Sequence, residues 1–308
     1  MLALLAVTFA TASLFNYNAK APIDLRPYSA TRVEGAAKVR NVTYADPLGG
    51  RVTAYIVEPE IVRGKNPGLI FAHWCLGNRS EFLPEAVALA RRGFVSILPD
   101  DPQMRPAPWT QPMEGAIRNP QQDRDLEIRA IVDLRRAIDV LSSIADSSRL
   151  AYVGHSCNAA NGGNLAGVDH RLKGYVLIGG SAARADFDSR NFEGAFFAEQ
   201  EYAQLRKVPR PLLRRYSAVI SPLDPVRFIS HAAPAAIYMQ FGMGDAYVTR
   251  YDALHYFKAA SEPKRMTWYF GGHEIDSDQA RYDRAEWLTR LLIPRLREGA
   301  GDSRLPHR

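Results

Sequence analysis

Short apolar runs of four to seven residues, bounded by loop residues, alternate along this chain with stretches of helical periodicity. The runs are GLIFAH from Gly68, FVSIL from Phe94, LAYVG from Leu150, YVLI from Tyr175, AAIYMQF from Ala235 and MTWYF from Met266. Continuous apolar runs of this length are typical of strands buried on both faces. Strands separated by helices need crossover connections, which place helices on both faces of a mostly parallel sheet.

The first part of the chain departs from this alternation of strands and helices. The segments VRNVTY from Val39 and VTAYIV from Val52 are rich in β-branched and aromatic residues, and Gly49 and Gly50 lie between them. They predict an antiparallel hairpin. The predicted fold class is therefore α/β, a mostly parallel sheet with an antiparallel N-terminal hairpin and helices on both faces.

A single domain over residues 30–298 is expected, with a polar tail at 299–308. One segment, 181–234, interrupts the alternation before the last two strands and contains several aromatic residues. We expect a small helical insertion there, either a lid over an active site or ordinary packing.

The N-terminal residues 1–15 (MLALLAVTFATASLF) are apolar and contain an A-x-A pattern at Ala10–Ala12, as the end of a secretory signal does. No Lys or Arg precedes Lys20, so the basic start of such a signal is missing. The segment is too short to span a bilayer. A secreted or periplasmic protein is the expectation, with a cytoplasmic one as the alternative and no stable membrane insertion.

The charge balance, 39 Lys plus Arg against 33 Asp plus Glu, gives a net charge of +6. The arginines are spread along the chain without a zinc or ribonucleoprotein motif, so nucleic-acid binding is not expected. The two cysteines have no CxxC spacing, which argues against a zinc site. We expect neither a metal nor another cofactor.

The strand at Leu150 leads directly into His155, Ser156, Cys157 and Asn158, with helix-compatible residues after them. A strand, a sharp turn and a helix form the nucleophile elbow, usually written G-x-S-x-G. Here Gly154 is present, but Asn158 occupies the second glycine position and needs more room. Alone this is a weak signal, because a serine in an ordinary turn fits it equally well.

Two further residues complete a catalytic set in the chain order serine, acid, histidine. Asp245 follows the strand at Ala235 through Gly-Met-Gly, and His273 follows the last strand through Gly-Gly. In such a set the histidine takes the proton of Ser156 and returns it, while the aspartate fixes the imidazole tautomer. A negatively charged intermediate also needs donors, typically the backbone N–H of the residue after the serine, Cys157, and one from an early loop, here 73–75.

At these residues the chain resembles an esterase of the dienelactone hydrolase and cutinase-like branch of the α/β-hydrolases. The resemblance rests on LIFAHWCLGNRSEF from Leu69, AYVGHSCNAANG from Ala151, FGMGDAYV from Phe241 and YFGGHEI from Tyr269, and covers Val39 to Arg297. It implies that Cys75 supplies the second oxyanion donor, with Trp74 as the fallback. Members usually carry His-Gly where this chain has His73 and Trp74.

The two cysteines fall in the two loops expected to form the oxyanion hole, so they should be neighbours in space. A Cys75–Cys157 disulfide is one outcome, and it suits an oxidising compartment. Two free thiols that line the pocket are the favoured alternative, because an elbow residue has little freedom to adopt disulfide torsions.

The sequence therefore predicts a serine hydrolase that cleaves small-molecule or polymeric carboxylic esters through an acyl-enzyme. The alternatives are a peptidase or amidase with the same triad, and a binding protein on an inactive scaffold. We expect the substrate pocket to include His155, Trp109, Phe196 and Phe197. The oligomeric state is not assigned.

Overall fold

Ten strands form one mixed sheet within residues 13–61, 64–111, 117–184 and 207–293, the parts of the chain that the computed structural model describes. Their order across the sheet is β1-β3-β4-β6-β5-β7-β8-β9-β10, and β2 pairs with β3. The strands are β1 (Arg26–Pro27), β2 (Arg32–Glu34), β3 (Ala37–Ala45), β4 (Arg51–Pro59), β5 (Gly68–Ala72), β6 (Val95–Pro99), β7 (Leu150–His155), β8 (Gly174–Ile178), β9 (Ala236–Gly242) and β10 (Lys264–Tyr269).

From β6 to β10 every neighbouring pair of strands is parallel, whereas β1 to β4 pair antiparallel with their neighbours. All residues of β5, β6, β7 and β8 are buried. Strands in this position face helices on both sides, which is why their sequences are mostly apolar. The parallel arrangement places their carboxyl ends along one edge of the sheet.

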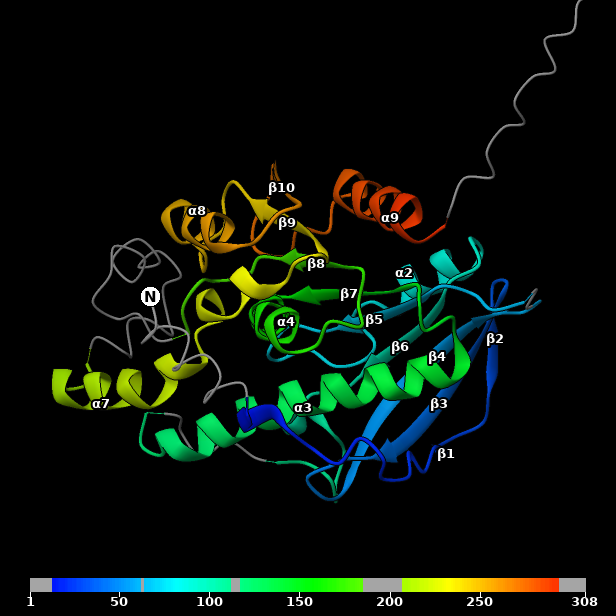
Figure 1. Cartoon of the computed structure of the whole chain (residues 1–308), viewed down its shortest axis with the longest axis horizontal. Coiled ribbons are helices and arrows are strands. Elements are labelled where there is room, and N and C mark those ends of the chain that lie inside the picture. Colours follow the sequence, from blue (N-terminus) through cyan, green and yellow to red (C-terminus); the bar gives the residue numbers. More distant parts are fainter. Residues whose placement is uncertain (1–12, 62–63, 112–116, 185–206, 294–308) are drawn as a thin grey trace, which may run out of the picture.

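Helices cover both faces of the sheet (Figure 1). Helices α2 (Leu83–Ala90) and α9 (Asp278–Leu292) cover one face, and α3 (Pro120–Ile144), α4 (Cys157–Val168) and α8 (Arg250–Ala259) cover the other. Helix α7 (Arg210–Ile220) packs against α3. Short 3₁₀ turns occupy Ser13–Phe15, Pro102–Met104, Ser221–Leu223, Pro225–Arg227 and Ile229–His231. Among the described residues, no helix has the length and apolar character needed to span a membrane.

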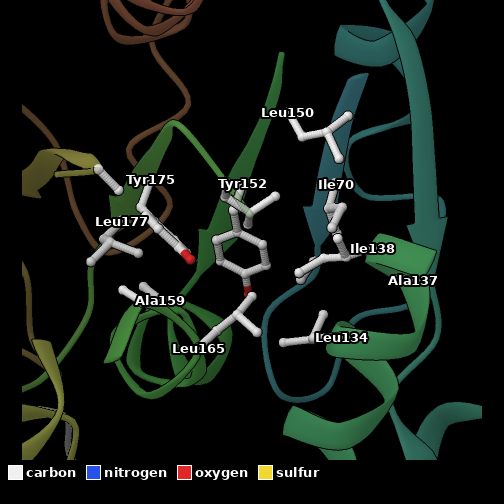
Figure 2. Packing of buried hydrophobic residues seen from close by; sticks show 14 of the residues in the cluster. Ile70, Leu134, Ala137, Ile138, Leu150, Tyr152, Ala159, Leu165, Tyr175 and Leu177 are labelled. Atoms are coloured by element: carbon white, nitrogen blue, oxygen red, sulfur yellow. The ribbon is translucent and has the colours of Figure 1, made fainter. Parts of the chain in front are cut away.

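Each face of the sheet has its own hydrophobic cluster. Figure 2 shows one, in which Tyr152 of β7 lies between α4 and α3 and packs against Tyr175 and aliphatic side chains. Its hydroxyl donates to the backbone oxygen of Asn158 at 2.7 Å, so the ring is buried without an unpaired polar atom. This packing fixes the start of α4, and therefore the turn before it, against the sheet.

The fold class predicted from the sequence is confirmed, and each predicted strand begins and ends within two residues of the observed one. Helix α8 and the short strands β1 and β2 were not predicted. Phe15, the last residue of the apolar N-terminal segment, is buried against Phe228. The cleavage pattern at 10–12 and the tail at 299–308 lie outside the described residues, so both remain predictions.

Candidate active site

The turn between β7 and α4 has the backbone of a nucleophile elbow. Ser156 has φ 57° and ψ −119°, a conformation that non-glycine residues rarely adopt, and its N–H donates to the oxygen of Ile178 at 2.8 Å. A Cβ at Gly154 would lie 2.5 Å from the backbone oxygen of Asn158. Only glycine fits there, and the strained turn holds the Ser156 side chain beyond the end of the sheet.

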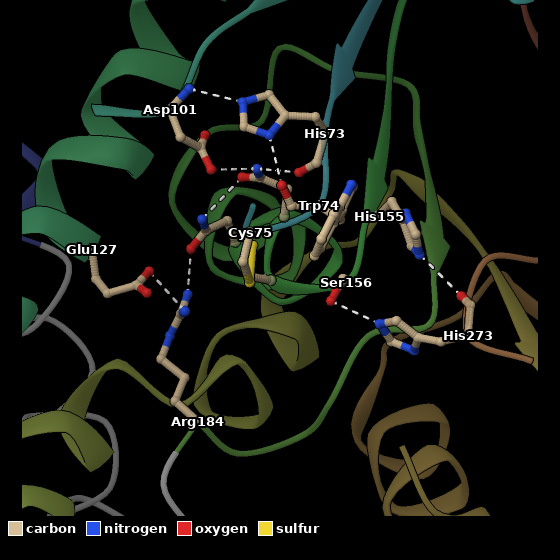
Figure 3. The surroundings of a disulfide bond; sticks show 12 residues. His73, Trp74, Cys75, Asp101, Glu127, His155, Ser156, Arg184 and His273 are labelled. Atoms are coloured by element: carbon tan, nitrogen blue, oxygen red, sulfur yellow. Dashed lines mark hydrogen bonds and ion pairs between the residues drawn. A yellow bond between two sulfur atoms is a disulfide. The ribbon is translucent and has the colours of Figure 1, made fainter. Parts of the chain in front are cut away.

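Ser156, His273 and Asp245 lie in one hydrogen-bonded line. Nε2 of His273 is 2.8 Å from Oγ of Ser156, and Nδ1 is 2.8 Å from Oδ2 of Asp245. Figure 3 shows the Ser156 hydroxyl directed at a ring nitrogen of His273. With Asp245 accepting at Nδ1, Nε2 is the nitrogen that can accept the hydroxyl proton. The Asp245 side chain is 1% exposed, and its other oxygen accepts the N–H groups of Tyr247 and Val248.

Strands β9 and β10 bring the acid and the histidine together. The two strands are parallel neighbours in register, with Gly242 opposite Tyr269. Beyond them the two loops are joined by hydrogen bonds from Met243 N–H to Tyr269 O (2.8 Å) and from Gly244 N–H to Gly271 O (2.9 Å). The Asp245 and His273 loops therefore form one unit at the carboxyl edge of the sheet.

The candidate oxyanion donors lie beside the serine. The N–H of Trp74 donates to Oε2 of Glu81 at 2.7 Å, so it is not free to bind a substrate oxygen. The backbone N–H groups of Cys75 and Cys157 have no hydrogen-bond partner among the described residues. Of the donors considered from the sequence, Cys75 and Cys157 remain.

Cys75 and Cys157 form a disulfide, with their Cα atoms 5.5 Å apart (Figure 3). The favoured expectation of two free thiols is therefore wrong. The elbow residue can pair because the candidate oxyanion loop, residues 73–75, approaches the start of α4 closely enough for a disulfide, which usually needs 4.4–6.8 Å between Cα atoms. The bond ties the two candidate donor residues to each other.

Asn158, in place of the usual second glycine, is fully buried and connects α4 to the oxyanion loop. Its amide donates to the oxygen of His73 at 2.6 Å and to Oδ2 of Asp101 at 2.8 Å. Burial raises the pKa of Asp101, while the neighbouring His73 and the Asn158 amide oppose the rise. The larger side chain of Asn158 is thus accommodated by polar contacts that hold the loop of residues 73–75 in place.

A cavity of about 1010 Å³ opens beside Ser156, between α2 and α9. His155 and His273 line it next to the serine, and its outer walls combine aromatic and apolar side chains with charged ones. The apolar and aromatic lining includes Trp74, Leu76, Phe82, Leu89, Tyr247 and Tyr282. Such a space admits a substrate group of drug-like size.

Of the four residues predicted to line the pocket, one lines the cavity, one does not, and two lie outside the described residues. His155 lines the cavity, whereas the ring of Trp109 contacts Tyr28, 5.9 Å between centroids, and does not line it. Phe196 and Phe197 lie outside the described residues, so their role as pocket walls remains a prediction. The described part of the 181–234 insertion includes α7, whose Tyr216 hydroxyl donates to Asp123 of α3 at 2.5 Å.

Glu81 was not identified from the sequence, although it lies within the stretch that carries the family resemblance. It contacts both Trp74 and His155. No spacing rule connects it to His155, which lies 74 residues away in the sequence. In the described part of the chain, no group of three or more His, Cys, Asp or Glu side chains is arranged to hold a metal ion.

The known proteins that match this chain are solved structures. No protein-family model matches the sequence, and no curated protein matches it. An acetyl xylan esterase from a Paenibacillus species is 19% identical, with 93% of this chain and 94% of that chain covered and a TM-score of 0.72. Acetyl xylan esterase 1 from a Thermoanaerobacterium species is 15% identical, with 94% of each chain covered and a TM-score of 0.74. A chain from Klebsiella pneumoniae assigned as a dienelactone hydrolase is 16% identical, with 81% and 96% covered and a TM-score of 0.57.

Proposed function

Since this chain has the α/β-hydrolase fold, we propose that it is a serine hydrolase that cleaves carboxylic esters through an acyl-enzyme on Ser156. The line of hydrogen bonds from Asp245 through His273 to Ser156, each 2.8 Å long, is the observation that carries this proposal. It supplies a nucleophile, a base and a group that orients the base, in the geometry that acyl transfer requires.

In the first half of the reaction, Oγ of Ser156 attacks the ester carbonyl carbon as Nε2 of His273 takes the hydroxyl proton. The negative charge on the carbonyl oxygen is stabilised by the N–H groups of Cys75 and Cys157. The carboxylate of Asp245 stabilises the imidazolium. The C–O bond to the alcohol then breaks, and His273 returns the proton to the leaving oxygen.

In the second half, a water molecule takes the place of the alcohol. His273 removes a proton from the water as its oxygen attacks the acyl carbon, and the same donors stabilise the second intermediate. The bond to Oγ breaks, the proton returns to Ser156, and the carboxylic acid leaves.

An ester is favoured over an amide for two reasons. Three of the similar solved structures are named as acetyl xylan esterases or assigned as a dienelactone hydrolase. The cavity beside Ser156 is wide and lined partly by exposed aromatic side chains such as Trp74 and Tyr282, which suits a small-molecule ester or the end of a polymer.

Labelling with a fluorophosphonate probe, followed by a series of p-nitrophenyl esters of increasing chain length, tests this proposal. We expect Ser156→Ala and His273→Ala each to lower kcat by about 10⁶-fold, and Asp245→Asn by about 10⁴-fold. Ser143→Ala is the control, because the Ser143 hydroxyl on α3 donates to a backbone oxygen remote from the site.

Three results would contradict the proposal. Full ester hydrolysis by a folded Ser156→Ala protein would show that Ser156 is not the nucleophile. Faster cleavage of p-nitroanilides than of the matching esters would favour an amidase. Failure of the wild-type protein to react with the probe would favour a binding protein.

A further inference from the structure

His155, the residue before the nucleophile, joins two loops that belong to different parts of the chain. Its Nδ1 is 2.6 Å from Oε1 of Glu81, and its Nε2 is 3.0 Å from the backbone oxygen of His273. The ring is 7% exposed. Figure 3 shows its far nitrogen directed at that backbone oxygen. One imidazole therefore connects the loop before α2 with the loop of the proposed base.

The two contacts place one proton on the His155 ring and a second one between the ring and Glu81. A carbonyl oxygen only accepts, so Nε2 of His155 carries a hydrogen. The short contact on the other side then holds a further proton, either on Nδ1 facing a carboxylate or on Glu81 facing a neutral ring. In both forms two hydrogen bonds are made, and the ring cannot turn without losing them.

The second oxygen of Glu81 reaches the oxyanion loop. Oε2 accepts the N–H of Trp74 at 2.7 Å, one residue before the proposed donor Cys75. The same loop turns tightly, with a bond from Gly77 N–H to Trp74 O at 2.8 Å. Glu81 thus holds the peptide next to the donor with one oxygen and His155 with the other.

From these contacts we infer that Glu81 and His155 are positioning residues that hold the oxyanion loop and the His273 loop in place around Ser156 through hydrogen bonds. Neither residue belongs to the triad or to the oxyanion donors; each acts through a neighbour, Glu81 through Cys75 and His155 through His273. The inference rests on the proposed ester hydrolysis, since the two loops are those that the mechanism uses.

Glu81→Gln separates geometry from charge. The Gln amide can still accept from Trp74 through its oxygen and donate to Nδ1 of a neutral His155 through its nitrogen. We expect its kcat to stay within about threefold of wild type. Glu81→Ala and His155→Ala remove the contacts, and misplacement of reacting groups by a fraction of an ångström to 1 Å lowers kcat by about tenfold to a hundredfold. Glu81 and His155 also line the cavity, so a positioning role predicts a fall in kcat that exceeds any rise in KM.

The double variant and a matched control complete the kinetic test. If the pair acts as one unit, Glu81→Ala with His155→Ala should lose no more than the worse single variant. Glu58→Ala is the control. The Glu58 side chain is 21% exposed against 22% for Glu81 and pairs with Arg40 on the antiparallel hairpin, remote from the site. Its kcat should equal that of wild type.

Backbone amide exchange at Trp74 tests the anchor without any substrate. The Trp74 amide should exchange at least about tenfold faster in Glu81→Ala than in wild type, and at the wild-type rate in Glu81→Gln. Equal exchange in all three proteins, wild-type kcat in Glu81→Ala, or a loss in Glu81→Gln as large as in Glu81→Ala would overturn the inference. A wild-type protein that cleaves no ester while the exchange pattern holds would refute the proposed function and leave the anchor standing.

Discussion

Reduction of the Cys75–Cys157 disulfide is the perturbation whose effect can be worked out most directly. The bond links residues 82 apart and joins the two loops that carry the proposed oxyanion donors. Breaking it changes no side-chain volume, in contrast to a cysteine substitution. Its consequences therefore report the cross-link itself.

The expected loss of stability follows from the size of the closed loop. For about 82 residues, the chain-entropy model gives about 4.5 kcal/mol at 25 °C. With a urea m-value of about 3 kcal/mol/M, this corresponds to a shift of the unfolding midpoint by about 1.5 M. Residual structure in the reduced, unfolded chain would make the shift smaller.

The effect on hydrolysis should be milder than the removal of a donor, which costs about 10²–10³-fold in kcat. After reduction the oxyanion loop is still held by the bonds from Asn158 to His73 and from Trp74 to Glu81. We therefore expect kcat for a p-nitrophenyl ester to fall by about tenfold and to recover on reoxidation.

The assay compares urea unfolding and ester turnover with and without dithiothreitol. Cys75→Ala with Cys157→Ala serves as the control and should not respond to the reductant. Thiol titration of the denatured, unreduced wild-type chain should detect no free thiol, in line with the absence of free cysteines among the described residues. Two titratable thiols, or a urea midpoint that dithiothreitol leaves unchanged, would refute the reasoning.

Three further predictions concern the neighbourhood of the site and the core. Asn158→Gly restores the usual elbow pattern but removes the amide bonds to His73 and a buried aspartate; we expect a loss of about 2–3 kcal/mol in urea unfolding, and a more stable variant would contradict this. Burial raises the pKa of Asp133 on α3 from 3.8 to about 7. The contribution of protonated Asp133 to the free energy of unfolding should be fully present below about pH 4 and be lost as the pH rises through about 7. Asp133→Asn should flatten that part of the profile of unfolding free energy against pH. Trp74→Ala and Tyr282→Ala on the cavity wall should lower kcat/KM for long-chain p-nitrophenyl esters by about tenfold more than for the acetate, whereas an equal loss on every ester would show that they only support the fold.

The sequence predicted the strands well because the central ones are buried on both faces and consist of uninterrupted apolar runs. The elements that it missed lack such a signal. Strands β1 and β2 are two and three residues long and mostly exposed. Helix α8 buries only Asp252, Ala253 and Tyr256, so its amphipathic pattern is weak. Its position after the Asp245 loop could be found only from the folded chain.

The candidate site likewise contains residues that the sequence could predict and residues that it could not. Ser156, Asp245 and His273 could be placed because each follows a recognisable strand and their order along the chain is diagnostic. The cysteines could be placed as neighbours for the same reason, but their covalent state depends on backbone geometry, which no pattern encodes. Glu81 reaches its partners through side chains, across 74 residues in the case of His155, and contacts of this kind leave no periodic trace.

The position of β10 at the edge of the sheet has a consequence for how the protein is made. Ser156 leaves the ribosome 117 residues before His273, about 6 to 23 s earlier at 5–20 residues per second. On the proposed mechanism, Ser156 lacks its base during this interval, although the loop of residues 73–75 can already be in place. The proposed activity would therefore arise only when the final strand pairs with β9, and a growing or truncated chain would carry the proposed nucleophile without its base.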